Sequence, residues 1–510
     1  MPSFAGPANA TPLSPLLTVP QLRSVEKRYA EASLMEKAGA AAFRLIESLL
    51  PKTSADGSIV ILCGPGNNGG DGLTLARLLR EQGFSPCVIA PVTDALPPDA
   101  DEALAKFLDR GGILHTTLPD LPAPPALIVD AIFGIGLNRA PDPPFDGLIR
   151  WVNDTHTAHR TPVVSLDIPS GLAGDTGVAW PPTVRATVTL SFIALKPGLL
   201  TLDGPDCCGE LRFSTLDIPP ADLAANADAQ ALHRRFIETH LPVVMRRRFR
   251  NVHKGSFGCL AVLGGASGMS GAPLLAGRAA ARLGAGKVRV GFLGDTPLFD
   301  PGCPELMLHS AQTLLRMPHD AWAIGCGLGT SPPAPDILMA ALPFDAPVLL
   351  DADALTLLGH HPEWVARVAE RHAPTVLTPH PAEAACLLQC STDEIQRHRP
   401  QAARDIARRY RAHTVLKGCG SIIADPAGSW VINTTGNPAL AFGGSGDVLA
   451  GMVGALLAQG VEASQALRYA VCLHGAAADA LVEKKEGPLG VLSEDIIRSA
   501  ARLVNEAIAL

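Results

Sequence analysis

Residues 58–71 read SIVILCGPGNNGGD and residues 442–448 read FGGSGDV, so the chain carries two glycine-rich loops of different design. Each loop leads into a run with helical spacing, where unpaired backbone N–H groups and the helix dipole favour a phosphate. An aspartate, Asp71 or Asp447, ends each glycine run. Because a carboxylate repels phosphate, each aspartate needs a role such as ion binding or proton transfer. Two such loops predict two chemistries in one polypeptide.

Short apolar runs alternate with helical patterns on both sides of these loops. Residues 25–50 predict the first helix, and the predicted strands are 58–62, 87–90, 126–129, 163–166 and 187–192, then 259–263, 287–290, 322–324, 347–350, 375–377 and 414–416. Strands that alternate with helices predict mostly parallel sheets covered on both faces. Residues 219–230, PPADLAANADAQ, lack apolar bulk and predict a linker. We therefore expect an α/β protein, with a Rossmann-like three-layer α/β/α domain over residues 1–221, a linker over 222–240 and a second α/β domain over 241–510.

Length and composition exclude several classes of protein. The 510 residues exceed what one core usually organises, and 47% of them are hydrophobic. A net charge of -7 gives no bulk attraction to nucleic acid or to anionic membranes. The 11 cysteines show no paired zinc spacing, the first 20 residues do not resemble a secretory signal, and glycines break the longest charge-free stretch. These features predict a cytoplasmic protein with reduced thiols and no membrane helix.

The first loop matches the pattern GxGxxG, and this leaves an ordinary dinucleotide-binding site as an alternative. Such a site needs an acidic residue about 20 residues further on to bind ribose, and only Asp94 is near that position. Asn67 and Asn68 place side-chain amides where a pyrophosphate loop usually has small residues. The Asn68 carbonyl oxygen also suits a hard cation. The loop therefore differs from that of a simple dehydrogenase.

Two further polar motifs follow predicted strands, VDAIFGIGLNR at 129–139 and SLDIPSGLAGDTG at 165–177. Open α/β sheets bind ligands outside the carboxyl ends of their strands. A single aspartate at such a place is usually a loop or cap residue, but three polar motifs together favour one pocket.

These motifs, with LMEKAG at 34–39, resemble the NAD(P)HX epimerase family over residues 20–221. The substrates of that family are NADHX and NADPHX, cofactors hydrated at C6 of the nicotinamide ring, whose R and S forms the enzyme interconverts. The resemblance implies a potassium ion held by Asn68, Asp130 and Ser170, and Asp167 as the catalytic proton shuttle. It also implies that the substrate contacts Asn67, Asn68, Gly69, Gly70, Asp71, Gly134, Ile135, Gly136, Leu137, Asn138, Arg139, Ala140 and Asp167.

The second loop has the geometry of a phosphoryl-transfer site, because its glycines open the helical run 448–458 and Asp447 lies in the first turn. Asp447 is placed to take a proton from an attacking hydroxyl. A glycine-rich segment that served only as a flexible connection to a capped helix would need no aspartate at position 447. The chain has no GxxxxGK[ST] motif at this loop, and the pattern resembles the ribokinase-like fold.

Within that fold, ordered motifs including HKGSFG at 253–258, DADAL at 351–355, TPHPAEAACLL at 378–388 and LKGCGS at 416–421 resemble the ADP- or ATP-dependent NAD(P)HX dehydratase family. The match covers about residues 241–510, and the fused order resembles bacterial bifunctional NAD(P)H-hydrate repair enzymes, which use ADP. The resemblance implies that the hydrate contacts Ala272, Gly329, His380 and Asp447. The implied nucleotide contacts are Lys417, Gly418, Cys419, Gly420, Ser421 and Gly446.

Some residues at this second site keep more than one interpretation. His380 would be an ordinary surface histidine outside this motif. Asp351 and Asp353 either bind a magnesium ion or cap the following helix. Three residues depart from the family pattern. Ser421 and Ser445 stand where Thr is usual and keep the hydroxyl function, whereas Met269 stands where Tyr is common and removes an aromatic contact.

Two rival functions remain open from the sequence alone. The second site by itself also fits a vitamin or sugar kinase, which would leave a stable phosphorylated product. The N-terminal domain is alternatively a noncatalytic binding module, although its aspartates and Ser170 are intact. The resemblance implies a homo-oligomer that acts on NADHX, NADPHX and ADP, with magnesium at the second site and no nucleic-acid or membrane partner.

Overall fold

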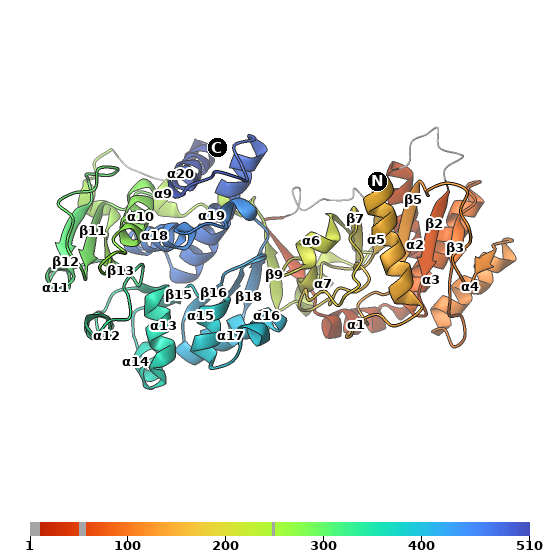
Figure 1. The fold of residues 1–510 in the computed structure, drawn as a ribbon, viewed down its shortest axis with the longest axis horizontal. Coiled ribbons are helices and arrows are strands. Elements are labelled where there is room, and N and C mark those ends of the chain that lie inside the picture. The colour runs from red at the N-terminus through yellow and green to blue at the C-terminus, as the bar shows by residue number, and fades with distance from the viewer. Residues whose placement is uncertain (1–10, 50–57, 247–249, 510) are drawn as a thin grey trace. The chain divides into compact units, whose positions relative to one another are not determined.

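The computed structural model describes residues 11–49, 58–246 and 250–509 (Figure 1). The chain divides into two compact units, one that includes residues 15–229 and one that joins residues 11–14 to the chain from Gln230 onward. Each unit is an α/β fold built on one sheet, which confirms the predicted fold class. The described helices include none that is long and apolar enough to cross a membrane.

In the described residues, the first unit holds a parallel seven-stranded sheet of order β4-β3-β2-β5-β6-β7-β8. Its strands are β2 (Ile59–Cys63), β3 (Cys87–Ile89), β4 (Leu114–His115), β5 (Leu127–Ala131), β6 (Val163–Leu166), β7 (Val188–Phe192) and β8 (Glu210–Ser214). The strand order reverses between β2 and β5. A doubly wound sheet binds its ligand at this switch point.

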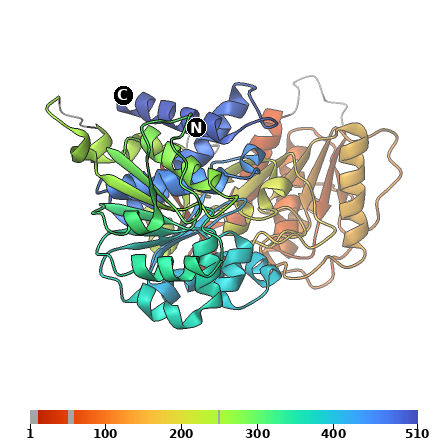
Figure 2. The ribbon, with the colours of Figure 1, turned by 60° about the vertical axis from the view of Figure 1, so that its left-hand side comes forward.

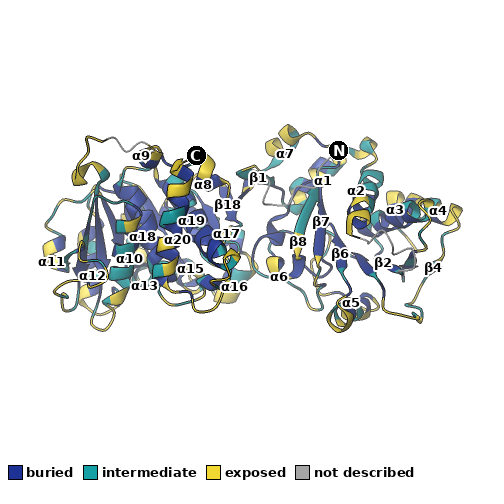
Figure 3. Ribbon diagram, turned by 90° about the horizontal axis from the view of Figure 1, so that it is seen from above, coloured by how far each residue is buried: buried dark blue, intermediate teal, exposed yellow. Residues whose placement is uncertain are grey.

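Helices cover both faces of this sheet and give the predicted three-layer arrangement. They are α1 (Val19–Arg28), α2 (Leu34–Leu49), α3 (Asn67–Glu81), α4 (Pro98–Asp109), α5 (Phe145–His159), α6 (Gly204–Cys208) and α7 (Pro220–Asn226). One core packs residues of α1 to α4 and α7 against Ile61 and Val129, and the other packs α5 against Val60 and Ile128. Neighbouring strand residues therefore point to opposite faces of the sheet. Both faces are covered, and Figure 3 shows the central strands of this sheet in the dark blue of buried residues.

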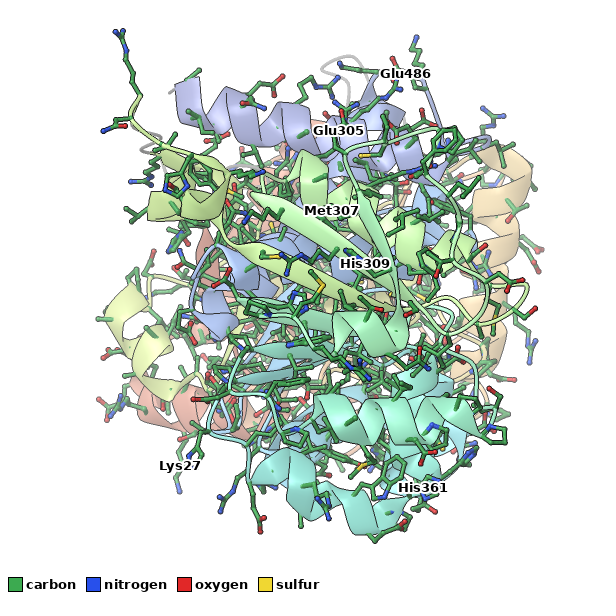
Figure 4. All side chains as sticks on the ribbon, turned by 90° about the vertical axis from the view of Figure 1, so that its left-hand side faces the viewer. Lys27, Glu305, Met307, His309, His361 and Glu486 are labelled. Carbon is green, nitrogen blue, oxygen red and sulfur yellow. The ribbon has the colours of Figure 1, made fainter. Side chains whose placement is uncertain are left out.

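In the described part of the chain, the second unit holds an eleven-stranded sheet of order β1-β9-β18-β17-β16-β15-β14-β13-β10-β11-β12. Its strands are β1 (Leu13–Leu16), β9 (Ala229–Leu232), β10 (Cys259–Gly264), β11 (Lys287–Phe292), β12 (Met307–Ser310), β13 (Ala321–Ile324), β14 (Val348–Leu350), β15 (Thr375–Leu377), β16 (His413–Leu416), β17 (Ile422–Ala424) and β18 (Trp430–Asn433). The strands from β12 to β16 pair in parallel, whereas β16, β17 and β18 pair antiparallel. The edge strand β12 is only partly buried, and Figure 4 labels its residues Met307 and His309.

Helices also cover both faces of the second sheet (Figures 1 and 2). They are α8 (Phe236–Thr239), α9 (Val243–Arg246), α10 (Gly271–Arg282), α11 (Ala311–Leu314), α12 (Pro333–Ala341), α13 (Asp353–His360), α14 (Val365–Ala369), α15 (Pro381–Leu388), α16 (Thr392–Arg397), α17 (Arg399–Tyr410), α18 (Ser445–Ala458), α19 (Ala463–Glu483) and α20 (Ser493–Ala509). The largest core joins α8, α10, α18, α19 and α20 to one face of the sheet. Helix α18 is almost wholly buried, which fixes the glycine-rich loop at its start.

Two segments differ from the expectation. The predicted helix over 25–50 is divided into two helices. Helix α1 ends at Arg28, and Ser33, whose backbone is in the left-handed region, lies directly before α2. The segment 222–240, expected to be a linker, contains most of α7, all of β9 and α8. Leu223 is buried in the first core, and Ala229 and Ala231 are fully buried. Small alanines gave this segment the composition of a linker although they fill tightly packed positions.

Two candidate active sites

The three polar motifs of the first unit meet at the carboxyl ends of their strands. They follow β2, β5 and β6, on both sides of the switch point. Their loops line a cavity of about 1060 Å³. A cavity of this size and position is where a doubly wound sheet binds a nucleotide-sized ligand.

Most of the predicted substrate contacts line this cavity. Asn67, Asn68, Asp71, Asp167 and the whole loop 134–140 are among its lining residues. Gly69 and Gly70 are not, because both pack inward. A Cβ on Gly69 would lie 1.9 Å from the Gly64 carbonyl oxygen, and one on Gly70 would lie 2.5 Å from the Met35 methyl carbon. Their small size serves the packing of α3.

Asp167 sits in a sharp turn directly after β6. Its φ is 66°, in the left-handed region, and the Ile168 N–H donates to the Leu166 carbonyl at 2.8 Å across it. A non-glycine residue held in this region is costly and recurs at functional sites. The turn leaves the Asp167 carboxylate nearly buried, paired with the Lys196 ammonium.

Two other carboxyl groups line the same cavity. Burial raises the pKa of Asp71 well above its usual range, and the nearby charge of Asp167 adds to this effect. Burial and Asp167 likewise raise the pKa of Glu26, which α1 contributes. The cavity therefore favours neutral carboxyl groups at Asp71 and Glu26.

The predicted cation ligands lie at the inner end of the same site. Asn68 is buried, and neither its Oδ1 nor its Nδ2 has a hydrogen-bond partner among the described residues. Asp130 is fully buried and accepts hydrogen bonds from the Ser165 Oγ at 2.8 Å, the Ser170 N–H at 2.9 Å and the Ser170 Oγ at 2.5 Å. An orphaned buried amide needs a ligand, a water or an ion to satisfy it.

In the second unit, Asp447 lies in the first turn of α18. The helix begins after Gly444, whose φ of 103° is one that a side chain rarely adopts. Burial raises the pKa of Asp447 to about 6, and Asp351 adds to the rise, whereas a hydrogen bond from the Cys326 thiol and the charge of Lys417 lower it. A carboxylate with such a pKa is suited to general-base catalysis near neutral pH.

A charged cluster lies against the start of this helix. Lys417 Nζ donates to Asp351 Oδ1 at 2.8 Å and lies 4.0 Å from Glu383 Oε2. A Cβ on Gly446 would lie only 3.4 Å from Lys417 Nζ, so the ammonium reaches the first turn of α18. Burial raises the pKa of Glu383 to about 7. The cluster thus offers a fixed cation beside the backbone N–H groups of the helix start.

His380 is half exposed and caps α15. Its Nδ1 accepts from the N–H groups of Ala382 at 3.2 Å and Glu383 at 3.3 Å, and its Nε2 lies 3.1 Å from Glu383 Oε1. Burial lowers its pKa, which favours the neutral ring. The cap fixes the ring close to Lys417, and substrate contact by His380 stays a prediction.

The predicted nucleotide loop 417–421 rests on a buried arginine of α17. Arg399 Nη2 donates to the Lys417 carbonyl at 3.3 Å. Gly418 has a φ of 136°, and a Cβ there would lie 2.9 Å from Arg399 Nη2. Burial lowers the pKa of Arg399 to about 10. The guanidinium therefore holds the loop by its backbone.

The remaining predicted contacts are Ala272, in the first turn of α10, and Gly329, in the loop before α12. The Gly329 N–H donates to Asp353 Oδ2 at 2.8 Å, and Ala272 packs beside Gly327. Asp351 and Asp353 point in different directions because Ala352 between them has a φ of 49°. Among the described residues, no side chain caps α13, so their interpretation as helix caps is wrong.

Sequence reasoning missed four residues of these sites, Glu26, Lys196, Cys326 and Glu383. Lys196 had a signal, since it is the one charged residue in the apolar stretch SFIALKPGLL at 191–200. Glu383 lies in the motif TPHPAEAACLL at 378–388, but the motif alone does not indicate its role. Glu26 and Cys326 carry no local signal. The described residues also include no group of three or more His, Cys, Asp or Glu side chains arranged to hold a metal ion.

Two family models match the chain. The model described as YjeF-related protein N-terminus matches residues 31–198, and the model described as NAD(P)H-hydrate dehydratase matches residues 260–502. The two matches fall on different units and together include both sites.

Curated relatives match nearly the whole chain. The bifunctional NAD(P)H-hydrate repair enzyme Nnr of Escherichia coli K12 is 38% identical over 479 residues, which cover 92% of this chain and 89% of the relative. The enzyme of the same name from Coxiella burnetii is 37% identical over 496 residues, covering 94% and 96%. A crystal structure of the ADP/ATP-dependent NAD(P)H-hydrate dehydratase of Bacillus subtilis, co-crystallised with ATP and Mg²⁺, is 29% identical. It covers 54% of this chain and 98% of its own, with a TM-score of 0.47.

Proposed function

Because the chain belongs to the family of bifunctional NAD(P)H-hydrate repair enzymes, the family predicted from its motifs, we propose that it repairs hydrated nicotinamide cofactors with two active sites. The first unit interconverts the R and S forms of NADHX and NADPHX. The second unit converts the S form to NADH or NADPH and consumes ADP. The observation that supports this proposal is that a carboxyl group, Asp167 in one unit and Asp447 in the other, lies among the residues that the motifs of that unit predict.

In the first unit, Asp167 is the proton shuttle. It donates a proton to the C6 hydroxyl, which departs as water with its C–O electron pair. The ring nitrogen supplies the electron pair for a C=N bond to C6. Water then adds to the other face of C6, which returns the electron pair to nitrogen and the proton to the protein. The loop 134–140 and the two asparagines, Asn67 and Asn68, hold the substrate. Because burial raises the pKa of Asp71, its carboxyl group ionises less readily, which lessens repulsion with the substrate phosphates.

The residues of this site fit a potassium ion. The buried Asn68 carboxamide lacks a partner among the described residues, and Asp130 and Ser170 supply further oxygen atoms nearby in the same strand-end loops. Oxygen ligands suit a weakly hydrated cation. When bound, potassium supplies positive charge that orients these oxygen atoms and the substrate.

In the second unit, Asp447 takes the proton of the C6 hydroxyl as this oxygen attacks the terminal phosphorus of ADP. The backbone N–H groups at the start of α18 and the Lys417 ammonium stabilise the charge that develops on the phosphoryl group. The phosphorus–oxygen bond to AMP breaks, and phosphate then leaves C6 with its C–O electron pair as the ring nitrogen donates its lone pair to form a C=N bond. Loss of a proton from C5 to the departing phosphate forms the C5–C6 double bond and returns the electron pair to nitrogen. The products are NAD(P)H, AMP and phosphate.

The loop 417–421 and Gly446 bind the nucleotide in this proposal, and Ala272, Gly329 and His380 contact the hydrate. Asp351 and Asp353 fit a magnesium ion only together with nucleotide phosphates, because the described residues offer no three-ligand group of their own. Magnesium commonly uses one or two carboxylates plus substrate phosphates. When bound, it neutralises charge on the nucleotide.

A cytoplasmic location and a homo-oligomeric state complete the proposal. The location is supported by the 11 cysteines, all of them in the described part of the chain and none of them joined in a disulfide bond. Light scattering on the purified protein tests the oligomeric state.

The decisive experiment incubates the full chain with purified R and S forms of NADHX, with ADP or ATP. We expect the absorbance of NADH to return, both forms to disappear, and AMP to accumulate with ADP. A stable phosphorylated product would support a kinase instead. Consumption of the S form alone, with no acceleration of R-to-S exchange, would leave the first unit without its proposed activity.

A further inference from the structure

Lys196 is a fully buried cation behind the first active site. It follows β7, and its Nζ donates to Ser191 Oγ at 2.9 Å, to the Phe192 carbonyl at 2.8 Å and to Asp167 Oδ1. An ammonium group has three N–H donors. All three are therefore used within the protein, and none is left for the substrate.

This arrangement makes the two oxygen atoms of Asp167 unequal. Oδ1 accepts from Lys196 and also from the Phe192 N–H at 3.3 Å. Oδ2 has no hydrogen-bond partner in the described part of the chain. It lies 3.3 Å from the position that a Cβ on Gly134 would occupy, so it faces the loop that lines the cavity. One oxygen is anchored and the other is presented to the cavity.

Lys196 also distinguishes Asp167 from the other carboxyl groups of the cavity. Glu26 and Asp71 line the same space, with Asp99 close to Asp71 and Arg23 close to Glu26. Within the described residues, the ion pair with Lys196 is made by Asp167 and by neither Glu26 nor Asp71. A buried charge is tolerated when it is paired and hydrogen-bonded. Burial raises the pKa of Glu26 and of Asp71 and the charge of Lys196 opposes that rise, but of the three carboxyl groups Lys196 forms its hydrogen-bonded ion pair with Asp167 alone.

We propose that Lys196 is a positioning residue of the first active site, which anchors Asp167 by Oδ1 and so makes Oδ2 the atom that exchanges the proton with the substrate. The inference rests on the epimerase function proposed above. It assigns to Lys196 no contact with the substrate. Its loss therefore affects turnover and leaves substrate affinity almost unchanged.

The test compares Lys196→Met with the wild-type full chain in R-to-S exchange, measured by chromatography. We expect kcat to fall roughly 10- to 100-fold with KM within about twofold, since loss of a group that orients a functional side chain typically costs about that much. An unchanged kcat, or a rise in KM alone, would overturn the proposal.

Ser191→Ala is the matched control, because it removes one acceptor of Lys196 and leaves the ion pair to Asp167 intact. We expect its kcat to fall less than about threefold with KM unchanged, and a fall in kcat as large as that of Lys196→Met would also overturn the proposal. Dehydration of the S form with ADP reports whether each variant is folded. If the wild-type chain catalyses no exchange, the proposed function fails. If the wild-type chain catalyses exchange and Lys196→Met catalyses it equally well, only the proposed role of Lys196 is wrong.

Discussion

At the scale of one residue, Asp447 is a partly buried carboxyl group whose raised pKa suits the role of general base that we propose for it. We expect Asp447→Asn to lower the rate of ADP-dependent dehydration by roughly 100-fold or more, because the amide cannot take the C6 hydroxyl proton. Nucleotide contacts of the loop 417–421 rest on its backbone and should survive. The return of NADH absorbance measures the rate, and calorimetry measures ADP binding. Near-normal turnover with normal ADP affinity would show that Asp447 is structural.

The same residue predicts how stability and activity depend on pH. Burial raises the pKa of Asp447 from 3.8 to about 6, so its contribution to the free energy of unfolding is favourable below pH 3.8 and is lost as the pH rises to 6. At pH 7.5, Asp447→Asn should therefore unfold at the same or a higher temperature than wild type. The wild-type dehydration rate should fall as the pH drops through about 6, where the carboxylate takes up a proton. Differential scanning fluorimetry and initial rates at each pH measure both effects, and a large drop in the melting temperature of the variant would contradict the first.

Asn68 tests the cation assignment. Asn68→Leu keeps a side chain of similar size and removes the orphaned carboxamide, so half-maximal epimerase activity should need at least about tenfold more potassium. Asn67→Leu is the control, because it alters the adjacent exposed amide and should keep the wild-type potassium requirement. Exchange rates at graded potassium concentrations, with sodium replacing potassium at constant ionic strength, measure this. If the wild-type exchange rate does not depend on the potassium concentration, the assignment of Asn68 as a potassium ligand is wrong.

At the scale of elements, the start of α18 depends on one glycine. A Cβ on Gly444 would meet Leu275 Cδ1 at 2.7 Å in a left-handed backbone, whereas a Cβ on Gly443 meets nothing within 4 Å. Gly444→Ala should therefore cost about 1–2 kcal/mol from backbone conformation alone and weaken ADP binding, while Gly443→Ala should have little effect. Urea unfolding and calorimetry of the pair measure this difference. Equal behaviour of the two variants would show that the helix start tolerates the side chain.

The elements also show how far the sequence predicts the fold. The predicted strands, such as β2 and β10, are the central ones, because burial on both faces leaves a continuous apolar run. The missed strands lie toward the outsides of the two sheets: β4 and β8 in the first, and β1, β9, β12, β17 and β18 in the second. Several are short or only partly buried, so their sequences lack that signal.

Across the whole molecule, each predicted site forms from motifs far apart in the sequence, because parallel strands bring their carboxyl ends to one edge. This rule places Asn68, Asp130 and Asp167 together without any knowledge of side chains. It does not predict which groups pack behind the motifs. Lys196 reaches the first site from the segment after β7 and Glu26 reaches it from α1, and only the folded backbone brings them there.

The division into two units gives the last prediction. Asp167 and Asp447 belong to different units, each with its own sheet and core, so their losses should be separable. Asp167→Asn should keep ADP-dependent dehydration of purified S-NADHX at the wild-type rate and abolish the enzyme-accelerated use of the R form. Asp447→Asn should do the reverse, because R-to-S exchange needs neither ADP nor the second site. Chiral chromatography of both forms, read alongside NADH absorbance, measures the two activities in one reaction. Addition of the two inactive variants together should restore use of the R form, since the S form made by one protein is free to reach the other. Equal loss of both activities in either variant would mean that the two sites do not work independently.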